Sequence, residues 1–585
     1  MRLPLLAAAL LAAALLAAAA APPPAYDIVI RGGTIYDGSG HPPYVADLAI
    51  ARDRIARIAP HIAAHGRTEI DAHGRAVAPG FINMLAHPEE SLLIDGRALS
   101  DLTQGVTLEV MGEDSMGPLT PAMKADALRH QGDIKYPVTW TTLGEYMEGL
   151  QKRGIAPNVA AFVGEGVVRT NVLGETSAQP DAAQLAQMRA LVARAMEEGA
   201  LGLTTALIYP PNTFAKTPEL LDLARVSARC GGMYIAHMRN EGDRILVAIA
   251  ETVTIAQGSG APAEIYHFKQ GGRANWDKLA PAVAAIEAAR ARGIRITADM
   301  YVYTAGATGL DAAMPHWVQD GGLDKWIARL RDPGVRARVI SEMRDLHPAD
   351  WENLYAGAGA EGTLLLGFKT AALKPLTGKT LAEVARQRGK SPEETAIDLV
   401  IEDGSRIEVA YFLMSEGNIR REIALPWMAF GSDERAPAPE GVFLLSNDHP
   451  RAYGNFARLL GKYVRDEHAI PLAEAVRRLT SLPADNLSIQ GRGRLAPGAF
   501  ADVVVFDPAA IQDHATFAKP HQLSTGVETV IVNGGIALRD GRATGASTGR
   551  FVHGRAWTGA PGGGCRASAA AWTWAGQPRA AAHAG

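Results

Sequence analysis

The chain has 585 residues, of which 47% are hydrophobic and 21% charged, so it can bury a large core. Its 58 basic and 62 acidic side chains give a net charge of −4, which excludes the basic balance of a nucleic-acid-binding protein. We therefore expect a small-molecule partner and no nucleic acid.

The N-terminal segment "MRLPLLAAALLAAALLAAAAAPPPAY" has one early arginine, a Leu/Ala run and small residues before a proline cluster. This layout predicts a signal peptide over residues 1–21, cleaved between Ala20 and Ala25, and an exported protein that is periplasmic or secreted. The alternative is an uncleaved membrane anchor, although the run is barely long enough to span a bilayer. No later segment is apolar enough to cross one, so we expect no membrane contact after cleavage.

The two cysteines are predicted to be free. Cys230 lies in a helical stretch and Cys565 lies in a Gly-rich tail, and nothing in the sequence brings them together. The tail itself, residues 558–585, is Gly/Ala-rich without usable periodicity and is predicted to be poorly ordered.

Alternating apolar and polar residues predict short strands near both chain ends. "YDIVIRGGTIYDG" and "ADLAIARDRIARI" lie in the first part, and "ADVVVFDP" and "VETVIVNGGIALRDG" lie near the end. The pair Asn533-Gly534 indicates a hairpin. We expect residues 26–78 and 485–550 to build one small β-sandwich together.

Between these ends, apolar runs alternate with amphipathic helical stretches, the pattern of repeated βα units. Eight runs qualify as strands, the number that closes a (β/α)₈ barrel of the TIM type: "VAPGFINML", "GVTLEVMG", "NVAAFVGEG", "ALGLTTAL", "GMYIAHM", "AEIYHFK", "RITADMYVY" and "WMAFGSD". The predicted barrel domain covers residues 79–484, with an insertion at about 304–425 that could form a lid.

Polar residues follow these strands where a barrel places its active site, at the carboxyl ends. Only three of the sixteen histidines end a predicted strand, and they are joined there by carboxylates and a lysine: His87, Glu113, Asp114, Glu165, His237, His267, Lys269 and Asp433. Two imidazoles and a carboxylate suit zinc, which lowers the pKa of bound water to about 7. Asp433 is then placed to accept the proton of that water. Taken singly, each histidine could be a core residue and Asp433 a helix cap.

The ordered motifs resemble the amidohydrolase superfamily, and specifically the D-aminoacylase (N-acyl-D-amino-acid deacylase) family, from Tyr26 to about Thr548. The similarity is carried by "DIVIRGGTIYDG", "LIYPP", "HMRNEG", "YHFK", "GSD", "HPRAYGNFARLLGKYVR" and "ADVVVFDP". It implies hydrolysis of N-acyl-D-amino acids to a carboxylate and a free D-amino acid.

Carried over by position, the resemblance implies that His237 and His267 hold the tightly bound metal and that Asp433 is the catalytic acid/base. It also implies that Lys269, Arg451 and Tyr303 hold the carboxylate and carbonyl of the substrate. An Arg fork beside a Lys suits a free carboxylate.

This sequence departs from the family at the second, looser metal site. The His-x-His after the first strand reads Leu85-Ala86-His87, and leucine cannot bind a metal. The family's bridging cysteine is absent, and register favours Asp114 in its place, whereas Glu113 directly follows the strand end at Gly112 and is slightly preferred. We hypothesise a working enzyme with one tightly bound Zn²⁺ and a doubtful second site.

Two other functions are compatible with the sequence. A related amidohydrolase could act on another amide, a dipeptide, a cyclic imide or a lactone with the same metal chemistry. A non-catalytic periplasmic binding protein is prompted by Leu85 and the missing cysteine. The preferred acyl group and side chain, the stereochemistry apart from the resemblance, and the oligomeric state are not predicted.

Overall fold

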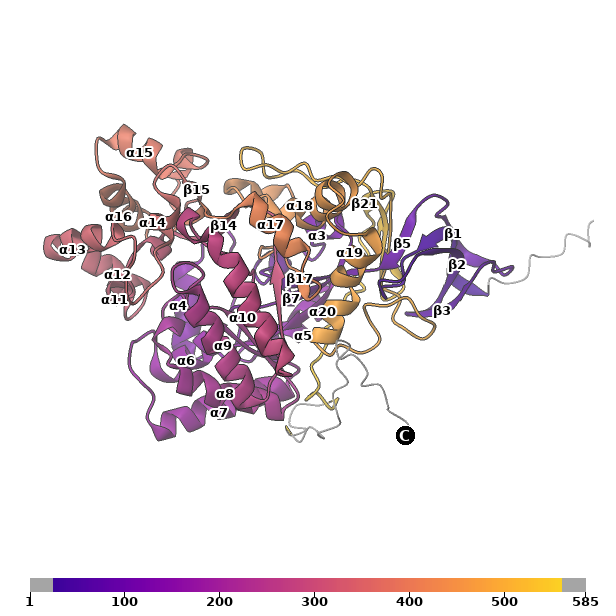
Figure 1. The fold of residues 1–585 in the computed structure, drawn as a ribbon, viewed down its shortest axis with the longest axis horizontal. Coiled ribbons are helices and arrows are strands. Elements are labelled where there is room, and N and C mark those ends of the chain that lie inside the picture. Colours follow the sequence, from indigo (N-terminus) through magenta and orange to yellow (C-terminus); the bar gives the residue numbers. More distant parts are fainter. Residues whose placement is uncertain (1–24, 560–564, 566–585) are drawn as a thin grey trace, which may run out of the picture.

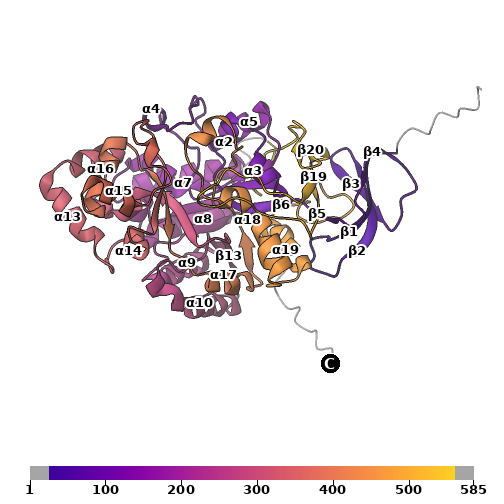
Figure 2. The same cartoon turned by 90° about the horizontal axis from the view of Figure 1, so that it is seen from above.

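The computed structural model describes residues 25–559 and residue 565, so the predicted signal peptide lies outside the described residues. Figure 1 shows three parts: a β-sheet at one end, a barrel with helices around it, and a helical insertion at the other end. Figure 2 shows the same order from above. None of the helices in this part of the chain is both long and apolar enough to cross a membrane.

Nine strands from both chain ends form one sheet. The first part contributes β1 (Tyr26–Ile35), β2 (Tyr44–Ala51), β3 (Arg54–Ala59), β4 (Gly66–Asp71) and β5 (Ala76–Pro79). The last part contributes β18 (Val503–Phe506), β19 (Val527–Val532), β20 (Gly535–Arg539) and β21 (Arg542–Ala543). β18 runs antiparallel to β5 and so joins the two ends. Ile30, Leu48, Val505 and Ile531 share one apolar core, as facing layers of a sandwich do.

The turn between β19 and β20 is the hairpin that the sequence indicates. Its two residues, Asn533 and Gly534, have φ angles of 48° and 80°. Left-handed backbone at both positions is what a two-residue type I′ turn requires, and Asn-Gly adopts it at little cost.

The middle of the chain forms the predicted (β/α)₈ barrel, so the fold class is confirmed. Within the described residues its eight parallel strands are β6 (Phe81–Ala86), β7 (Val106–Met111), β8 (Asn158–Ala161) continued by β9 (Val163–Gly164), β10 (Gly202–Ala206), β11 (Met233–His237), β12 (Ala263–Ile265), β13 (Ile296–Met300) and β17 (Met428–Phe430). The ring closes between β17 and β6, where Asp433 N donates to Leu85 O and His87 N donates to Glu434 O, each at 2.8 Å. The first and last strand ends therefore meet at the same mouth.

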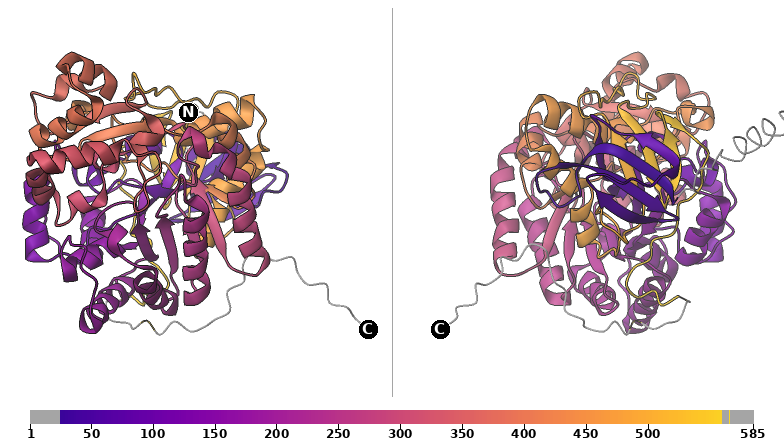
Figure 3. Two further views of the ribbon diagram at one scale, coloured as in Figure 1. Left: turned by 60° about the vertical axis from the view of Figure 1, so that its left-hand side comes forward. Right: turned by 90° about the vertical axis from the view of Figure 1, so that its right-hand side faces the viewer.

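Helices cover the outside of the barrel, as Figure 3 shows. They are α5 (Leu143–Arg153), α6 (Glu165–Leu173), α7 (Ala182–Glu197), α8 (Thr217–Arg229), α9 (Ile245–Ser259), α10 (Leu279–Ala291), α18 (Arg451–Arg458), α19 (Leu472–Leu479) and α20 (Ser481–Asn486). The helix α8 illustrates why they form: a proline occupies its first turn, and Leu220, Leu223 and Ala224 lie on one buried face.

The segment after β13 forms a separate layer over the barrel mouth. Its strands β14 (Ala305–Gly309), β15 (Thr363–Gly367) and β16 (Glu408–Phe412) make a three-stranded antiparallel sheet. Its helices are α11 (His316–Gln319), α12 (Leu323–Leu330), α13 (Pro333–Met343), α14 (Leu354–Ala358), α15 (Leu381–Arg388), α16 (Pro392–Asp403) and α17 (Glu416–Ile423). Residues of all three strands line the cavity at the mouth.

The prediction of two free cysteines is wrong. Cys230, fully buried just after α8, forms a disulfide with Cys565. The backbone N of Cys565 also donates to Glu197 Oε1 of α7 at 2.8 Å. The partners are 335 residues apart, and local periodicity carries no information on contacts at such a separation. The rest of the predicted disordered tail, apart from residues 558 and 559, lies outside the described residues.

Candidate active site

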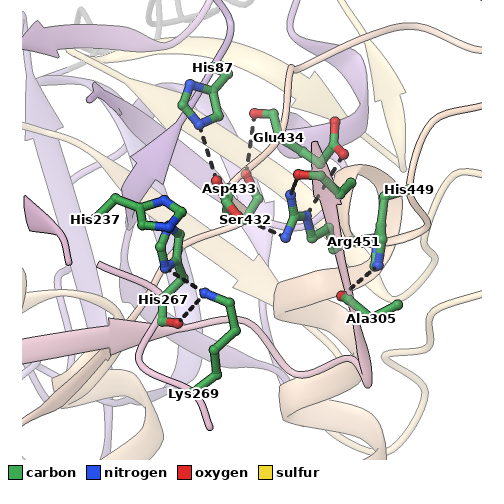
Figure 4. A network of polar contacts seen from close by, with 12 residues as sticks. His87, His237, His267, Lys269, Ala305, Ser432, Asp433, Glu434, His449 and Arg451 are labelled. Carbon is green, nitrogen blue, oxygen red and sulfur yellow. Dashed lines mark hydrogen bonds and ion pairs between the residues drawn. The ribbon is translucent and has the colours of Figure 1, made fainter. Parts of the chain in front are cut away.

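A cavity of about 720 Å³ opens at the carboxyl ends of the barrel strands. Its lining includes most of the strand-end residues singled out from the sequence: His87, Glu113, His237, His267, Lys269 and Asp433, together with Arg451 of α18. Figure 4 shows His87 and Lys269 on opposite sides of Asp433 and His267. The barrel thus brings together residues that are more than three hundred positions apart in the chain.

Three of these residues have a left-handed backbone: Glu113, His267 and Asp433, with φ angles of 65°, 34° and 53°. Side chains on β7 alternate, and Leu108 and Val110 face the barrel interior, so ordinary strand geometry would turn Glu113 outward. The positive φ aims its carboxylate into the mouth instead. Such backbone is costly for residues other than glycine and is concentrated at functional sites.

The carboxylate of Glu113 is shared by two imidazoles. Its Oε1 lies 2.8 Å from His237 Nδ1 and 2.5 Å from His267 Nε2, and ligand atoms of the three residues lie within 4.8 Å of one another. Burial alone would raise the pKa of Glu113, but the two imidazoles hold it well below its usual range. Two nitrogens and an oxygen that converge in a buried pocket match the donor set of a divalent transition metal.

A second group meets the other side of the same carboxylate. His87 Nε2 lies 3.9 Å from Glu113 Oε2 and 3.1 Å from Asp433 Oδ1. Leu85 is fully buried two residues earlier, after the β6–β7 ladder shifts register between Asn83 and Ala86. This shift places both Met84 and Leu85 in the interior core, so that Leu85 lies below the mouth while His87 lines the cavity.

Asp433 is held in its ionised form by its neighbours. Burial alone would raise its pKa, but the Arg451 guanidinium, whose N lies 2.8 Å away, and the imidazoles of His267 and His87 bring it to about 2. Asp433 is therefore a carboxylate at neutral pH, free of a proton and close to the metal-ligand group.

Glu241 contacts His267 on the side of the imidazole ring that faces away from Glu113. Its Oε1 lies 3.0 Å from His267 Nδ1, and its Oε2 forms an ion pair with Lys269 Nζ at 2.6 Å. Lys269 Nζ is also 2.7 Å from His267 Nδ1 and donates to His267 O at 2.9 Å. We assign the imidazole proton to Nδ1, where Glu241 accepts it, because Lys269 already donates to the carboxylate and the carbonyl and keeps its third ammonium hydrogen for a ligand. A carboxylate that orients a ligating histidine is the usual outer partner of a metal site.

Three remaining candidates lie elsewhere, and one of them, Glu165, is fully buried at the first residue of α6. Asp114 is exposed, its Oδ1 accepts a hydrogen bond from Ser115 N, and it is outside the set of described residues that line the cavity. Tyr303 is buried behind His449 and does not line the described cavity either, whereas Tyr301 does. The Tyr301 ring lies 4.3 Å from the Arg451 guanidinium, and burial raises the pKa of Tyr301 to about 12.

Two site residues were therefore missed by sequence reasoning. Glu241 stands four residues after His237 within "HMRNEG", a motif that the sequence already singled out, so its signal was available. Tyr301 and Tyr303 alternate with Val302 at the end of one strand, and sequence alone does not decide which of them faces the cavity.

The comparisons with known proteins agree with this geometry. The model of the amidohydrolase family designated Amidohydro_3 matches residues 68–537, and the chain belongs to this family. A D-aminoacylase from Alcaligenes xylosoxydans xylosoxydans is 33% identical over 532 residues, which are 90% of this chain and 97% of that protein. The predicted resemblance to the D-aminoacylase group is thus confirmed.

Two solved structures show the same fold. A D-aminoacylase with a binuclear metal centre, described as activated by one metal and attenuated by a second, superimposes with a TM-score of 0.75 at 31% identity, covering 90% of this chain and 100% of that one. An N-acyl-D-glutamate deacylase from Bordetella bronchiseptica, complexed with zinc and a phosphonate mimic of the tetrahedral intermediate, gives 0.74 at 30% identity, covering 90% and 99%.

Proposed function

We propose that the protein hydrolyses the amide bond of N-acyl-D-amino acids with one divalent metal, zinc, held by His237, His267 and Glu113. The observation that carries this proposal is the Glu113 oxygen that lies within 2.8 Å of both imidazoles. The D preference is taken from the D-aminoacylase and the N-acyl-D-glutamate deacylase to which the chain is similar.

The metal and Asp433 divide the chemistry between them. A divalent metal held by these ligands would polarise the scissile carbonyl and lower the pKa of the attacking water. Asp433, ionised at neutral pH, accepts the proton of that water and passes it to the leaving amine. Arg451 pairs with Asp433 and keeps its carboxylate oriented toward His87 and the ligand group.

The cations beside the site recognise the amino-acid part of the substrate. Arg451 is 1% exposed and Lys269 is 8% exposed, so neither is an ordinary surface charge. Arg451 Nε and Tyr301 Oη have no hydrogen-bond partner among the described residues. Buried donors of this kind are costly unless a ligand satisfies them, and a substrate carboxylate would do so. We assign this role to Lys269, Arg451 and Tyr301.

The test is release of free amino acid from paired N-acetyl-D and N-acetyl-L substrates by protein stripped of metal and reloaded with graded zinc. We expect D-specific activity that saturates near one zinc per chain. His237→Ala should lose both zinc and activity, whereas His61→Ala, which changes a histidine that is 80% exposed at its side chain, should keep both. Retention of zinc and activity by His237→Ala would refute the proposed site.

We also propose that the protein is exported, on the signal-like character of residues 1–21 alone. The mass of the mature protein from whole cells tests this. A chain that begins between Ala20 and Ala25 supports export, and an intact Met1 in the soluble fraction contradicts it.

A further inference from the structure

The cavity is large for the smallest substrates of the proposed reaction. Its volume is about 720 Å³. At about 30 Å³ for each water-sized group, that space holds on the order of two dozen non-hydrogen atoms. An N-acetyl amino acid with a small side chain fills less than half of it, so one substituent of the amide has room to be long.

Apolar side chains from three segments line one part of the cavity, beside polar residues of the same segments such as Asp133 and Ser446. Ile134, Tyr136, Phe368 and Phe443 line it, and each is at most 9% exposed. Lys374 ties the segments together, because its Nζ pairs with Asp133 Oδ2 at 2.6 Å and donates to the carbonyls of Phe368 and Leu445. We call these four side chains the apolar wall. The contacts of Lys374 hold the apolar wall in a defined position.

The apolar wall lies on the His87 side of the site. Tyr136 Oη donates to Glu90 Oε1 at 2.7 Å, and Glu90 follows His87 by three residues. Lys269 lies on the opposite side of Asp433 and His267 in Figure 4. When the substrate carboxylate faces Lys269 and Arg451, the acyl group on the other side of the scissile bond points toward the apolar wall.

We propose that the preferred substrates carry a medium-length or long fatty acyl group, which binds along the apolar wall. The inference rests on the proposed function, because it uses the same scissile bond and the same carboxylate site. After the amino-acid part is seated, the volume leaves room for roughly ten acyl carbons. The products are then a fatty acid and a free D-amino acid.

The experiment measures kcat/KM for N-acetyl, N-butanoyl, N-hexanoyl, N-octanoyl and N-decanoyl derivatives of one D-amino acid, D-leucine, with zinc-loaded enzyme. A fully buried methylene is worth up to about fourfold, so even partial burial should raise kcat/KM at least about tenfold from acetyl to octanoyl. A flat or falling profile with good N-acetyl activity overturns the inference and leaves the proposed function intact. Absence of turnover of every D substrate overturns the proposed function and the inference with it.

Variants locate the effect. Phe368→Ala should lower the ratio of octanoyl to acetyl kcat/KM by about tenfold, because it removes part of the apolar wall. Leu354→Ala is the matched control, because it also truncates a buried side chain that lines the cavity. Leu354 belongs to the segment of Glu352, which accepts a hydrogen bond from the backbone N of Glu241, the partner of Lys269. Leu354→Ala should leave the ratio unchanged.

If Phe368→Ala does not fold, Ile134→Ala tests the same wall from another segment, and its N-acetyl activity reports that the site is intact. A direct measurement uses the product: octanoate should inhibit N-acetyl hydrolysis at lower concentration than acetate does. Equal ratios in the wall variants and in Leu354→Ala, or equal inhibition by the two acids, would overturn the placement of the acyl chain.

Discussion

The two sides of the Glu113 carboxylate are unequally equipped to hold a metal. On one side, His237 and His267 are 4% and 2% exposed, and Glu241 orients His267 from behind. On the other side, the His87 side chain is 33% exposed, and Asp433, the carboxylate 3.1 Å from its Nε2, is paired with Arg451. Leu85 occupies the place of a second imidazole. On the proposed assignment, one face of the carboxylate binds the metal while the other faces the residues of proton transfer.

The largest expected effect separates the two sides directly. His267→Ala removes a nitrogen ligand from the side of His237 and His267 and should abolish both zinc binding and activity. His87→Ala removes the lone imidazole of the other side and should keep close to one zinc per chain with measurable activity. Elemental analysis of the purified proteins and assay on an N-acyl-D-amino acid give the answer. Equal zinc loss in both variants would show that the sides are equivalent after all.

Asp433→Asn should separate proton transfer from metal binding. The amide is nearly the same size but cannot accept a proton, so kcat should fall by about 10²- to 10⁴-fold while zinc content stays unchanged. Asp114→Asn, a change in an exposed carboxylate outside the described cavity lining, is the control and should remain close to wild type. If Asp433→Asn also loses its zinc, then Asp433 is a ligand of the tight site and the division between the two sides is wrong.

Glu241→Ala tests the contact that orients His267 as a metal ligand. Loss of a carboxylate that orients a ligating histidine typically costs about 10- to 100-fold in metal affinity. We expect a weakening of this size in a chelator competition, which needs no substrate. Glu251→Ala is the matched control, because Glu251 pairs with Arg239 at 3.0 Å and lies outside the described cavity lining. Equal zinc affinity in the two variants would remove Glu241 from the site.

The barrel could be predicted from sequence because its signals are local. Each of its strands is a short apolar run bounded by turns, and the carboxyl ends of most runs carry a charged residue or a histidine. His87, His237, His267 and Asp433 were found in this way, and closure of the ring between β6 and β17 brings them together. Neither step required knowledge of contacts between distant residues.

The finer features depend on backbone conformation that the local pattern does not show. Alternation along β7 favours Asp114 as the inward carboxylate, and only the positive φ at Glu113 reverses this. Tyr301 and Tyr303 both follow β13. The course of the backbone after the strand decides that Tyr301 lines the cavity and Tyr303 does not. The Cys230–Cys565 disulfide joins parts of the chain 335 residues apart, a contact that neither helical stretch nor tail composition indicates.

Leu85→His gives the smallest expected change in activity and the sharpest test of the comparison. The substitution adds an imidazole on the His87 side, so the amount of metal bound in excess zinc should rise from one per chain toward two. Leu85 is fully buried and packs near Gly112 and Gly431, so Leu85→Met, which conserves volume with a thioether that binds zinc poorly, is the matched control and should stay at one. If Leu85→His also stays at one, the missing imidazole is not what limits the second site. The pairing of Asp433 with Arg451 then sets the limit, because a carboxylate already neutralised by a guanidinium has little left to offer a second cation.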